Sequence, residues 1–427
     1  MKYYLKIHPT DTVAVALTPL KKGSVLPIND NTTITLTEDI PQGHKFVIKA
    51  IKNGDPVIKY GFRIGFAQAD IQGGAWVHTH NLKTGLGELL EYTYEPEGHK
   101  DVEPTEPAYF DGYMRENGKV GVRNEVWIVP TVGCVNSIAR AIEATARANK
   151  PEGVDEVVAF THPYGCSQTT EDQENTRKIL ADLINHPNAG AVLVLGLGCE
   201  NSRIEVLKDY IGEVNPDRVK FLQVQDVENE QEEAEKLMNE LMAYAATFKR
   251  EKVNAKELII GMKCGGSDGL SGITANPTVG LFSDMLVSKG GTTILTEVPE
   301  MFGAETILMN RCANKELFEK TVHLINDFKE YFIKNGQEIY ENPSPGNKDG
   351  GITTLEDKSL GCTQKSGSSL VKGVLAYAEP VNTKGLNLLS APGNDLVAAT
   401  ACAASGAQMV LFTTGRGTPF ASPVPTV

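Results

Sequence analysis

The sequence lacks the features that mark several large protein classes. Among its 427 residues, no apolar run approaches the roughly 18 residues that a membrane-spanning helix needs. Its 41 lysines and arginines form no cluster, and the formal net charge is −13. Nucleic acids and anionic membrane surfaces are bound through basic patches. We therefore expect neither a nucleic acid nor a membrane as a partner.

Cysteine is scarce, with seven residues in the whole chain, and the spacing does not suggest a disulfide framework. Residues 1–10 lack the basic-then-apolar order of a signal peptide, so we expect a cytoplasmic protein with reduced thiols. Cys312 and Cys402 lie in helical surroundings and are interpreted as structural. The thiols that follow predicted strands, where a reduced thiol can bind a metal, are Cys134, Cys166, Cys199 and Cys264.

Several common catalytic motifs are also missing. Gly196 and Gly198 resemble the start of a dinucleotide-binding fingerprint, but Asn201 occupies the position of its third glycine. The sequence contains no phosphate-binding Gly-x4-Gly-Lys-Ser/Thr loop, no Gly-x-Ser-x-Gly elbow and no zinc-protease helix. The pattern therefore favours none of these enzyme classes.

The patterns that the sequence does contain predict two parts. A small β-rich domain, residues 1–90, is joined by an acidic, proline-bearing linker, residues 91–109, to a large α/β region, residues 110–427. Short strands separated by turn residues are expected in the first part at 12–17, 33–36, 45–48, 56–60 and 76–79. The large region alternates apolar strands with helical segments, which is typical of a mainly parallel sheet. It is long enough for two subdomains, which we place at residues 110–250 and 251–427.

In the large region, the expected strands are 126–132, 157–161, 191–197, 219–224, 258–262, 292–296, 386–390 and 409–413, and the expected helices include 137–148, 171–185, 228–248 and 316–334. Ligands of such sheets bind beyond the carboxyl ends of the strands. The most polar segment there is the loop 263–277, which has four glycines within eight residues. In the small domain, His78 and His80 are predicted to project from one face of a strand, whereas His44 is interpreted as a turn residue.

Five segments together resemble the altronate/galactarate dehydratase family: residues 78–81, 112–124, 263–269, 347–351 and 413–419. The resemblance covers essentially the whole chain, including an N-terminal domain similar to the SAF module of that family. It implies a sugar-acid dehydratase that needs a divalent metal, usually Fe²⁺, and forms 2-keto-3-deoxy acids. Altronate is the favoured substrate; galactarate or another hydroxy acid, including a sulfonated one, is the alternative. A silent sugar-acid binding protein is the alternative of a different class.

Elimination of water needs a base for the proton next to the carboxylate, and a cation that stabilises the enolate. His78 and His80 are expected as metal ligands or proton-transfer groups, and Lys263 as the base or a carboxylate ligand. The predicted substrate-binding residues are Arg123, Asn124, Ser267, Asp268 and Arg416. The predicted metal ligands are His78, His80, Cys166 and Cys264, with Fe²⁺ preferred over Mn²⁺ or another divalent ion.

An iron–sulfur cluster on Cys134, Cys166, Cys199 and Cys264 is the rival cofactor, which the absence of a Cys-x2-Cys pair disfavours. Members of the family continue for some tens of residues beyond position 427, so we expect a truncated C-terminus on which sheet completion and activity depend. We also expect a homodimer. If the histidines work beside the metal, the small domain must fold back over the strand ends of the large one.

Overall fold

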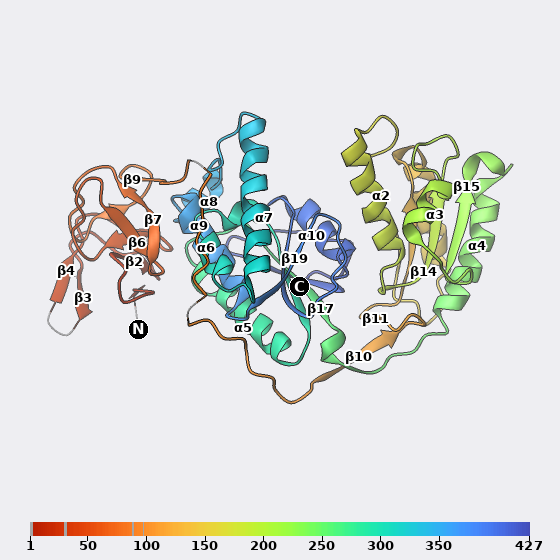
Figure 1. Cartoon of the computed structure of the whole chain (residues 1–427), viewed down its shortest axis with the longest axis horizontal. Coiled ribbons are helices and arrows are strands. Elements are labelled where there is room, and N and C mark those ends of the chain that lie inside the picture. Colours follow the sequence, from red (N-terminus) through yellow and green to blue (C-terminus); the bar gives the residue numbers. More distant parts are fainter. Residues whose placement is uncertain (1–2, 30–31, 88, 97) are drawn as a thin grey trace.

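The computed structural model describes residues 3–29, 32–87, 89–96 and 98–427. Figure 1 shows three lobes in a row, and their order in space differs from their order in the sequence. The β-rich N-terminal lobe lies at one end. The lobe formed by the C-terminal part of the chain lies in the middle, and the lobe that contains α1 to α4 lies at the other end. The N-terminal lobe therefore contacts the C-terminal part of the chain.

The N-terminal lobe is built from short antiparallel strands, as predicted. Two sheets, in the orders β1-β2-β5-β8 and β6-β7-β9, accompany the hairpin β3-β4. The strands are β1 (Tyr4–Leu5), β2 (Val13–Ala16), β3 (Val25–Asn29), β4 (Thr32–Thr35), β5 (Lys45–Val47), β6 (Pro56–Lys59), β7 (Phe62–Ala67), β8 (Trp76–Val77) and β9 (Leu82–Lys83). Strand β8 ends at Val77, so the prediction that His78 and His80 lie on a strand is wrong: both lie in the following turn.

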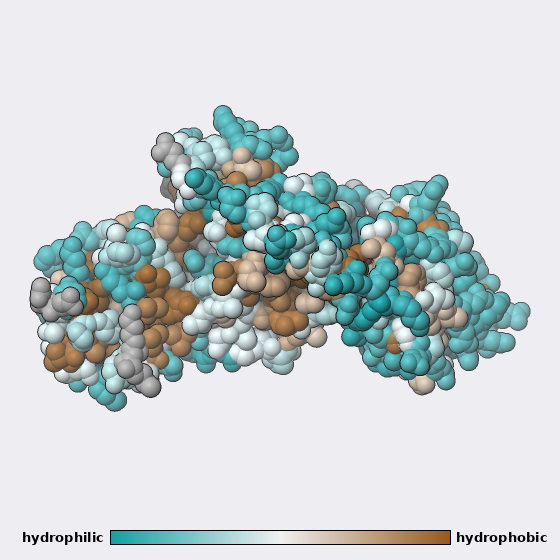
Figure 2. All heavy atoms as spheres, turned by 90° about the horizontal axis from the view of Figure 1, so that it is seen from below, coloured by the Kyte–Doolittle hydropathy of each residue, from teal (hydrophilic) through white to brown (hydrophobic). Residues whose placement is uncertain are grey.

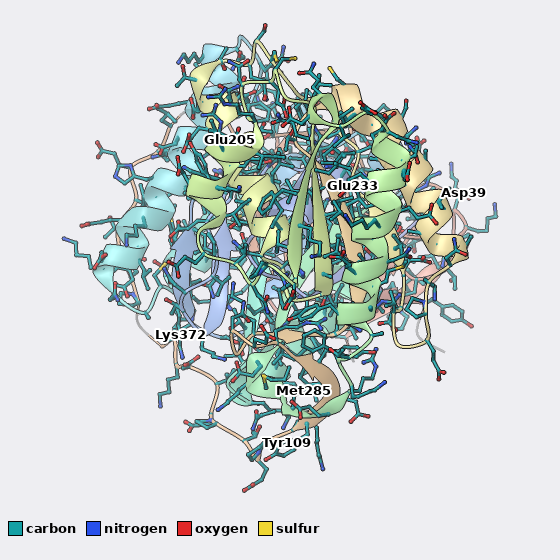
Figure 3. The ribbon with its side chains drawn as sticks, turned by 90° about the vertical axis from the view of Figure 1, so that its right-hand side faces the viewer. Asp39, Tyr109, Glu205, Glu233, Met285 and Lys372 are labelled. Atoms are coloured by element: carbon teal, nitrogen blue, oxygen red, sulfur yellow. The ribbon has the colours of Figure 1, made fainter. Side chains whose placement is uncertain are left out.

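The far lobe contains a parallel sheet in the order β13-β12-β14-β15. Helices α2 and α3 pack on one face of this sheet, and α1 and α4 on the other. Figure 3 looks onto this lobe, with Glu205 on α3 and Glu233 on α4. Its elements are β10 (Tyr109–Met114), β11 (Val120–Gly121), β12 (Glu125–Pro130), η1 (Gly133–Val135), α1 (Asn136–Ala148), β13 (Val157–Ala159), α2 (Thr170–Ile184), β14 (Ala189–Gly196), α3 (Ile204–Ile211), β15 (Val219–Gln223), η2 (Val224–Asp226) and α4 (Glu230–Ala245).

The middle lobe contains a second parallel sheet, in the order β19-β20-β18-β17-β21. The five strands of this sheet are β17 (Ile259–Gly265), β18 (Thr292–Leu295), β19 (Val371–Leu375), β20 (Gly385–Leu389) and β21 (Met409–Thr414). Strand β16 (Glu251–Asn254) precedes them in the chain and lies outside the sheet. The α-helices of the lobe are α5 (Ala275–Ser288), α6 (Glu305–Met309), α7 (Lys315–Lys334), α8 (Pro345–Asp349), α9 (Leu355–Cys362) and α10 (Asp395–Ala404), and its 3-10 helices are η3 (Ala255–Glu257), η4 (Ser271–Ile273), η5 (Val298–Met301) and η6 (Thr363–Ser366). Strand β17 continues three residues beyond the predicted end at Met262, so Lys263 and Cys264 are strand residues.

Two features connect the α/β lobes. Strand β16 pairs antiparallel with β10, and one hydrophobic core joins α2 and β14 of the far lobe to α10 and β21 of the middle lobe. Helix α5 instead leaves Leu281 and Met285 exposed, and Figure 2 shows apolar patches among hydrophilic surface on the face seen from below. No helix among the described residues is long and apolar enough to cross a membrane.

Candidate active site

The N-terminal lobe is joined to the middle lobe by two lysines that share one carboxylate. Lys45 Nζ lies 2.8 Å from Asp357 Oδ2, and Lys59 Nζ lies 2.8 Å from Asp357 Oδ1. All three side chains are buried. Burial lowers the pKa of Lys45 to about 8, whereas the pull of Asp357 exceeds the effect of burial at Lys59 and raises its pKa. Both lysines are therefore cationic at neutral pH, and this triad carries a net positive charge.

Glycines allow the backbones of the two lobes to approach closely. A Cβ on Gly269 would lie 2.0 Å from the Gly43 carbonyl oxygen, and one on Gly351 would lie 2.4 Å from the same atom. Gly351 also has a φ of +97°, a conformation that residues with side chains rarely adopt. The turn at Gly43 therefore lies directly against the loop that follows β17. The N-terminal lobe therefore folds back over this loop, which is the arrangement expected if the histidines work beside the site.

His44 is part of this junction rather than a simple turn residue. Its side chain is buried, and Nε2 lies 3.0 Å from the Asp349 carbonyl oxygen of the middle lobe. The Trp76 indole donates to His44 Nδ1 at 3.2 Å. Since an indole N–H can only donate, Nδ1 must be the acceptor and Nε2 carries the proton. Burial lowers the pKa of His44, so the ring is held neutral in one tautomer.

His78 is held in a short chain of hydrogen bonds. Lys45 Nζ donates to Thr353 Oγ1 at 2.6 Å, and this hydroxyl lies 3.1 Å from His78 Nδ1. The Thr353 hydroxyl can then donate its own proton to His78, which leaves Nε2 as the protonated nitrogen. Burial, followed by repulsion from Lys45, lowers the pKa of His78 to about 4. His80 differs, because it is exposed and contacts the Trp76 ring at a centroid distance of 5.4 Å.

A small polar pocket lies at this junction, with room for about one water molecule. Two ammonium groups, three hydroxyls and one amide line half of it, beside two carboxylates; the ammonium and hydroxyl groups suit a polyhydroxy carboxylate. The lining residues are Lys59, Tyr60, Ser267, Asp268, Ser271, Gly272, Asn276, Ile352, Asp357, Lys358, Gly361 and Cys362. The predicted binding residues Ser267 and Asp268 are thus among them. Asp268 also accepts hydrogen bonds from the backbone N–H groups of Leu270 and Ser271, which fixes the turn.

Lys263 is not arranged as a base. Its Nζ lies 2.5 Å from Glu297 Oε2 and 2.8 Å from Asp395 Oδ1, and it also donates to the Cys264 carbonyl oxygen. Burial alone would lower the pKa of Lys263, but Glu297 and Glu300 reverse this effect and raise it. A buried, paired ammonium cannot accept a proton. The prediction that Lys263 is the base is therefore wrong, and its charge instead stabilises the carboxylates at the end of β17.

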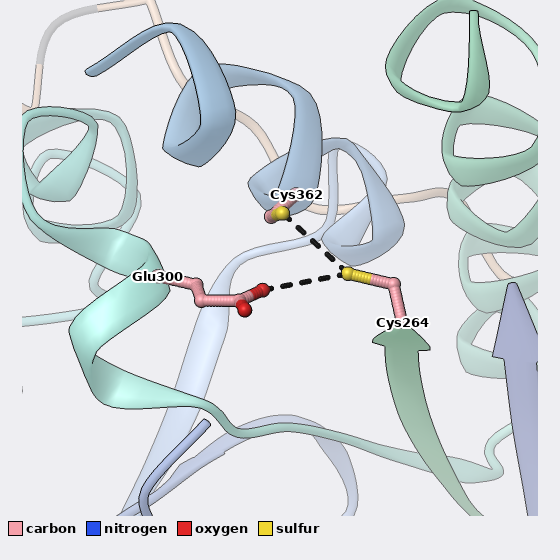
Figure 4. A group of neighbouring side chains, drawn as sticks. All are labelled: Cys264, Glu300 and Cys362. Carbon is pink, nitrogen blue, oxygen red and sulfur yellow. Dashed lines mark hydrogen bonds between the residues drawn. The ribbon is translucent and has the colours of Figure 1, made fainter. Parts of the chain in front are cut away.

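Beside Lys263 lies a compact group of potential metal ligands: Cys264, Glu300 and Cys362 (Figure 4). Cys264 Sγ lies 3.5 Å from Cys362 Sγ and 3.5 Å from Glu300 Oε2. Lysines surround the group, since Lys365 Nζ lies 2.9 Å from Cys264 Sγ and Lys358 Nζ lies 2.8 Å from Glu300 Oε1. The hydrogen bond between Cys264 and Cys362 is the largest cause that lowers the pKa of Cys264, to about 6.

The remaining predicted residues do not all meet here. Among the described residues, Cys264, Glu300 and Cys362 form the compact three-ligand group, so the predicted set of His78, His80, Cys166 and Cys264 is not brought together. Cys166 is exposed on the far lobe, whereas Cys264 is buried in the middle lobe. This separation also rules out the predicted four-cysteine cluster.

Arg123 and Asn124 are structural residues of the far lobe, at the start of β12. Arg123 Nε pairs with Glu125 Oε1 at 2.9 Å. Asn124 is fully buried, and its amide donates to the carbonyl oxygens of Gly153 and Ala245. Neither side chain is placed to bind substrate, so both predictions are corrected. Arg416 lies closer to the site, because its backbone N–H donates to the carbonyl oxygen of Gly266, the residue after β17.

Sequence reasoning missed Lys45, Lys59, Asp357, Lys358 and Lys365 because each is a common charged residue in an unremarkable segment. Their signal is burial: all five are at most 7% exposed. Charged residues are almost never fully buried unless they are paired, but burial of this kind cannot be read from one sequence. The alternation of Lys45 and Lys59 with apolar neighbours is equally typical of a solvent-facing strand position.

Three family models match this chain, one for each of its three lobes. The family descriptions that match are the Altronate/galactarate dehydratase SAF domain at residues 2–85, the D-galactarate dehydratase/Altronate hydrolase second domain at 112–246, and the D-galactarate/Altronate dehydratase C-terminal domain at 255–427. The altronate dehydratase of Bacillus subtilis is 55% identical over 100% of this chain and 86% of its own length. That of Escherichia coli is 54% identical over 99% of this chain and 86% of its own length.

The chain belongs to the altronate/galactarate dehydratase family. The galactarate dehydratase (L-threo-forming) of Escherichia coli is a more distant member, 34% identical over 98% of this chain and 82% of its own length. The family suggests a metal, and the group at Cys264 fits one in spacing: Cys264 Sγ lies 3.5 Å from both Cys362 Sγ and Glu300 Oε2, and one metal ion with bonds of about 2.3 Å to sulfur can join sulfurs up to about 4.6 Å apart. The ion would have to displace Lys365 and Lys358 from the ligand atoms.

Proposed function

We propose that the chain dehydrates D-altronate to 2-keto-3-deoxy-D-gluconate at the pocket between the N-terminal and middle lobes, which opens further to admit the acid. The observation that carries the proposal is the presence of several buried ammonium groups there. Lys45 and Lys59 share the single carboxylate of Asp357, and Lys59 and Lys358 line the pocket. Such a site stabilises a bound carboxylate and the enolate that forms from it. The identity of 54 to 55% with two altronate dehydratases favours altronate over galactarate.

The junction histidines are the proton-transfer groups that we favour. Dehydration removes the proton next to the carboxylate and protonates the departing 3-hydroxyl, so both a base and an acid are needed. His78 is neutral at pH 7 because its pKa is lowered to about 4, and its Nδ1 could accept a proton once the Thr353 hydroxyl turns away from it. His44 is oriented by Trp76 and by the Asp349 carbonyl oxygen. Ser267 and Asp268 in the lining would bind substrate hydroxyls, and Arg416 would bind a carboxylate at the rim.

We propose Fe²⁺ as the metal, with Mn²⁺ as the alternative, held by Cys264, Glu300 and Cys362. A divalent ion there would add positive charge for the enolate. Lys263, Lys358 and Lys365 supply such charge from the chain itself, because their pKa values are raised by the neighbouring carboxylates and Cys264. The lysines hold Glu297 and Glu300 in place.

Three broader expectations also remain proposals. We propose a cytoplasmic location, which the seven free cysteines among the described residues support because such a compartment keeps thiols reduced. We propose a homodimer, which the exposed Leu281 and Met285 of α5 support. We also propose that residues 1–90, 110–250 and 251–427 are separate domains joined by the linker 91–109.

The test is an anaerobic assay of the protein supplied with Fe²⁺ against a panel of aldonic and aldaric acids, with 2-keto acid as the readout. We expect turnover with D-altronate to exceed turnover with galactarate. A higher rate with galactarate would change the proposed substrate. Binding of D-altronate without product from any acid would contradict the proposed reaction.

A further inference from the structure

Three exposed cysteines occupy corresponding positions on neighbouring strands of the far lobe. Strand β12 lies between β13 and β14, and Pro130 of β12 pairs with Leu195 of β14. Cys134 and Cys199 each follow by four residues the member of this pair on their own strand. Cys166 follows β13 on the other side of β12. All three thiols therefore leave the carboxyl edge of one parallel sheet.

A glycine precedes each cysteine and lets the loops pack closely. A Cβ on Gly133 would lie 2.8 Å from the His162 carbonyl oxygen, and a Cβ on Gly165 would lie 2.8 Å from the Val132 side chain. Gly198 has a φ of +129°, which favours glycine. The loops that carry Cys134 and Cys166 are thus in direct contact.

Hydrogen bonds fix the three loops to one another. The Gly133 N–H donates to the Tyr164 carbonyl oxygen at 2.7 Å, which joins the loops of Cys134 and Cys166. The Thr131 hydroxyl donates to Glu200 at 2.5 Å, and Glu200 also accepts from the Gly198 N–H at 2.6 Å. These last two bonds tie the loop of Cys199 to the end of β12. These hydrogen bonds hold the three cysteine-bearing loops in fixed positions relative to one another.

The surroundings suit a negatively charged group of thiolates. Arg140 donates to the Thr161 hydroxyl in the Cys166 loop, and Arg177 donates to the Asn201 carbonyl oxygen in the Cys199 loop. Two guanidinium groups therefore lie next to the loops. The Asn136 side-chain oxygen, two residues beyond Cys134, is buried and finds no hydrogen-bond partner among the described residues. A buried polar atom without a protein partner can accept a hydrogen bond from a water or from a bound group.

We propose that Cys134, Cys166 and Cys199 hold an iron–sulfur cluster at this edge. Two thiolates on one metal ion are at most about 4.6 Å apart, twice the usual metal–sulfur distance of about 2.3 Å. The compact group found within 4.8 Å among the described residues is the one at Cys264 instead. The spread of the three thiols therefore favours a cluster of several irons over a single ion. With Cys264 buried in the other sheet, one iron of a four-iron cluster has no cysteine ligand from these loops.

This inference does not rest on the proposed substrate, since its test measures iron and sulfide and not turnover. The full chain is reconstituted anaerobically with Fe²⁺ and sulfide, and iron and acid-labile sulfide are determined together with the Mössbauer spectrum. We expect about four sulfides and about five irons per chain: about four irons for a cluster of the [4Fe–4S] type, and one for the single ion proposed at Cys264. The variants Cys134→Ser, Cys166→Ser and Cys199→Ser should each lose most of the labile sulfide.

The matched control is Cys312→Ser, a buried cysteine of the middle lobe whose sulfur contacts the Thr321 hydroxyl, which should keep the full content. If a variant fails to fold, alkylation followed by mass spectrometry gives a second readout on the unaltered chain. We expect the three thiols to be alkylated before reconstitution and protected after it. Iron without sulfide, a cluster content in the three variants as high as in the unaltered chain, or no protection of these thiols would overturn the proposal.

Discussion

Lys45 Nζ lies 2.8 Å from Asp357 Oδ2 across the junction of two lobes, although the two residues are 312 positions apart in the sequence. Both side chains are at most 1% exposed. Removal of one partner of a buried ion pair leaves the other charge without compensation. Removal of the Asp357 carboxylate leaves two buried ammonium groups without compensation, because Lys59 pairs with Asp357 as well.

We predict that Asp357→Asn lowers the free energy of unfolding by about 3 to 5 kcal/mol, measured by urea denaturation. The double variant Lys45→Met/Asp357→Leu should lose less than the sum of the single changes, since it leaves fewer unpaired charges. Asp39→Asn is the control, because Asp39 pairs with Lys21 at the exposed surface, and it should change little. Equal effects at Asp357 and Asp39 would contradict the account of the junction.

The two histidines beyond β8 should differ in their effect on activity. We predict that His78→Ala lowers kcat at least about 100-fold, the usual contribution of a proton-transfer group, with little change in Tm. His80→Ala should leave kcat nearly unchanged, because this ring is exposed. Steady-state kinetics with D-altronate checks both variants. A larger loss of kcat in His80→Ala than in His78→Ala would show that proton transfer has been assigned to the wrong ring.

The two arginines predicted to bind carboxylates should also differ. We predict that Arg416→Ala raises KM about tenfold or more, because a hydrogen bond to a charged group contributes about 1.5 to 3 kcal/mol. Arg123→Ala should leave KM unchanged, because Arg123 pairs with Glu125 far from the pocket. The KM values of the two variants are measured. A rise in KM confined to Arg123→Ala would show that Arg123, and not Arg416, binds the substrate carboxylate.

Titration of His186 should make the stability of the fold depend on pH. Its buried ring donates from Nε2 to the Ala407 carbonyl oxygen of the middle lobe and accepts the Asn188 N–H at Nδ1. Burial lowers its pKa from 6.5 to about 3. Because the folded-state pKa is below the unfolded one, its contribution is complete above pH 6.5 and is lost as the pH falls toward 3.

Between pH 7 and 4.5 we expect His186 to account for a loss of about 2 to 3 kcal/mol in the free energy of unfolding. His186→Gln removes the titrating group, so the variant should be less stable at pH 7 but should lose correspondingly less on acidification. Denaturant titrations of both proteins at the two pH values give the comparison. Parallel losses in the two proteins would show that His186 does not titrate in this range.

The sequence predicted the architecture more successfully than the site. Strands such as β14 are continuous apolar runs, and helices such as α4 are long and periodic, so local pattern is enough to find them. Strand β17 was predicted too short because Lys263 and Cys264 are polar, yet both lie in the strand and are buried. Polarity marked the end of the apolar run and not the end of the strand.

The site depends on contacts between residues that are far apart in the chain. His78 was found because it stands beside His80 in a distinctive motif, whereas His44 and Asp357 carry no such mark. Their roles follow from the packing of the N-terminal lobe on α9, which places Lys45, Lys59 and Thr353 next to one another. Arg123 shows the opposite error: its motif is distinctive, but its partners are structural.

The most direct test of the account is a crystal structure of His78→Ala with D-altronate bound. We predict that the substrate carboxylate lies against the ammonium groups of Lys59 and Lys358 in the pocket between the N-terminal and middle lobes. Its hydroxyls should contact Ser267 and Asp268. Substrate bound elsewhere, such as at the carboxyl edge of the far-lobe sheet, with this pocket left without ligand, would contradict the account.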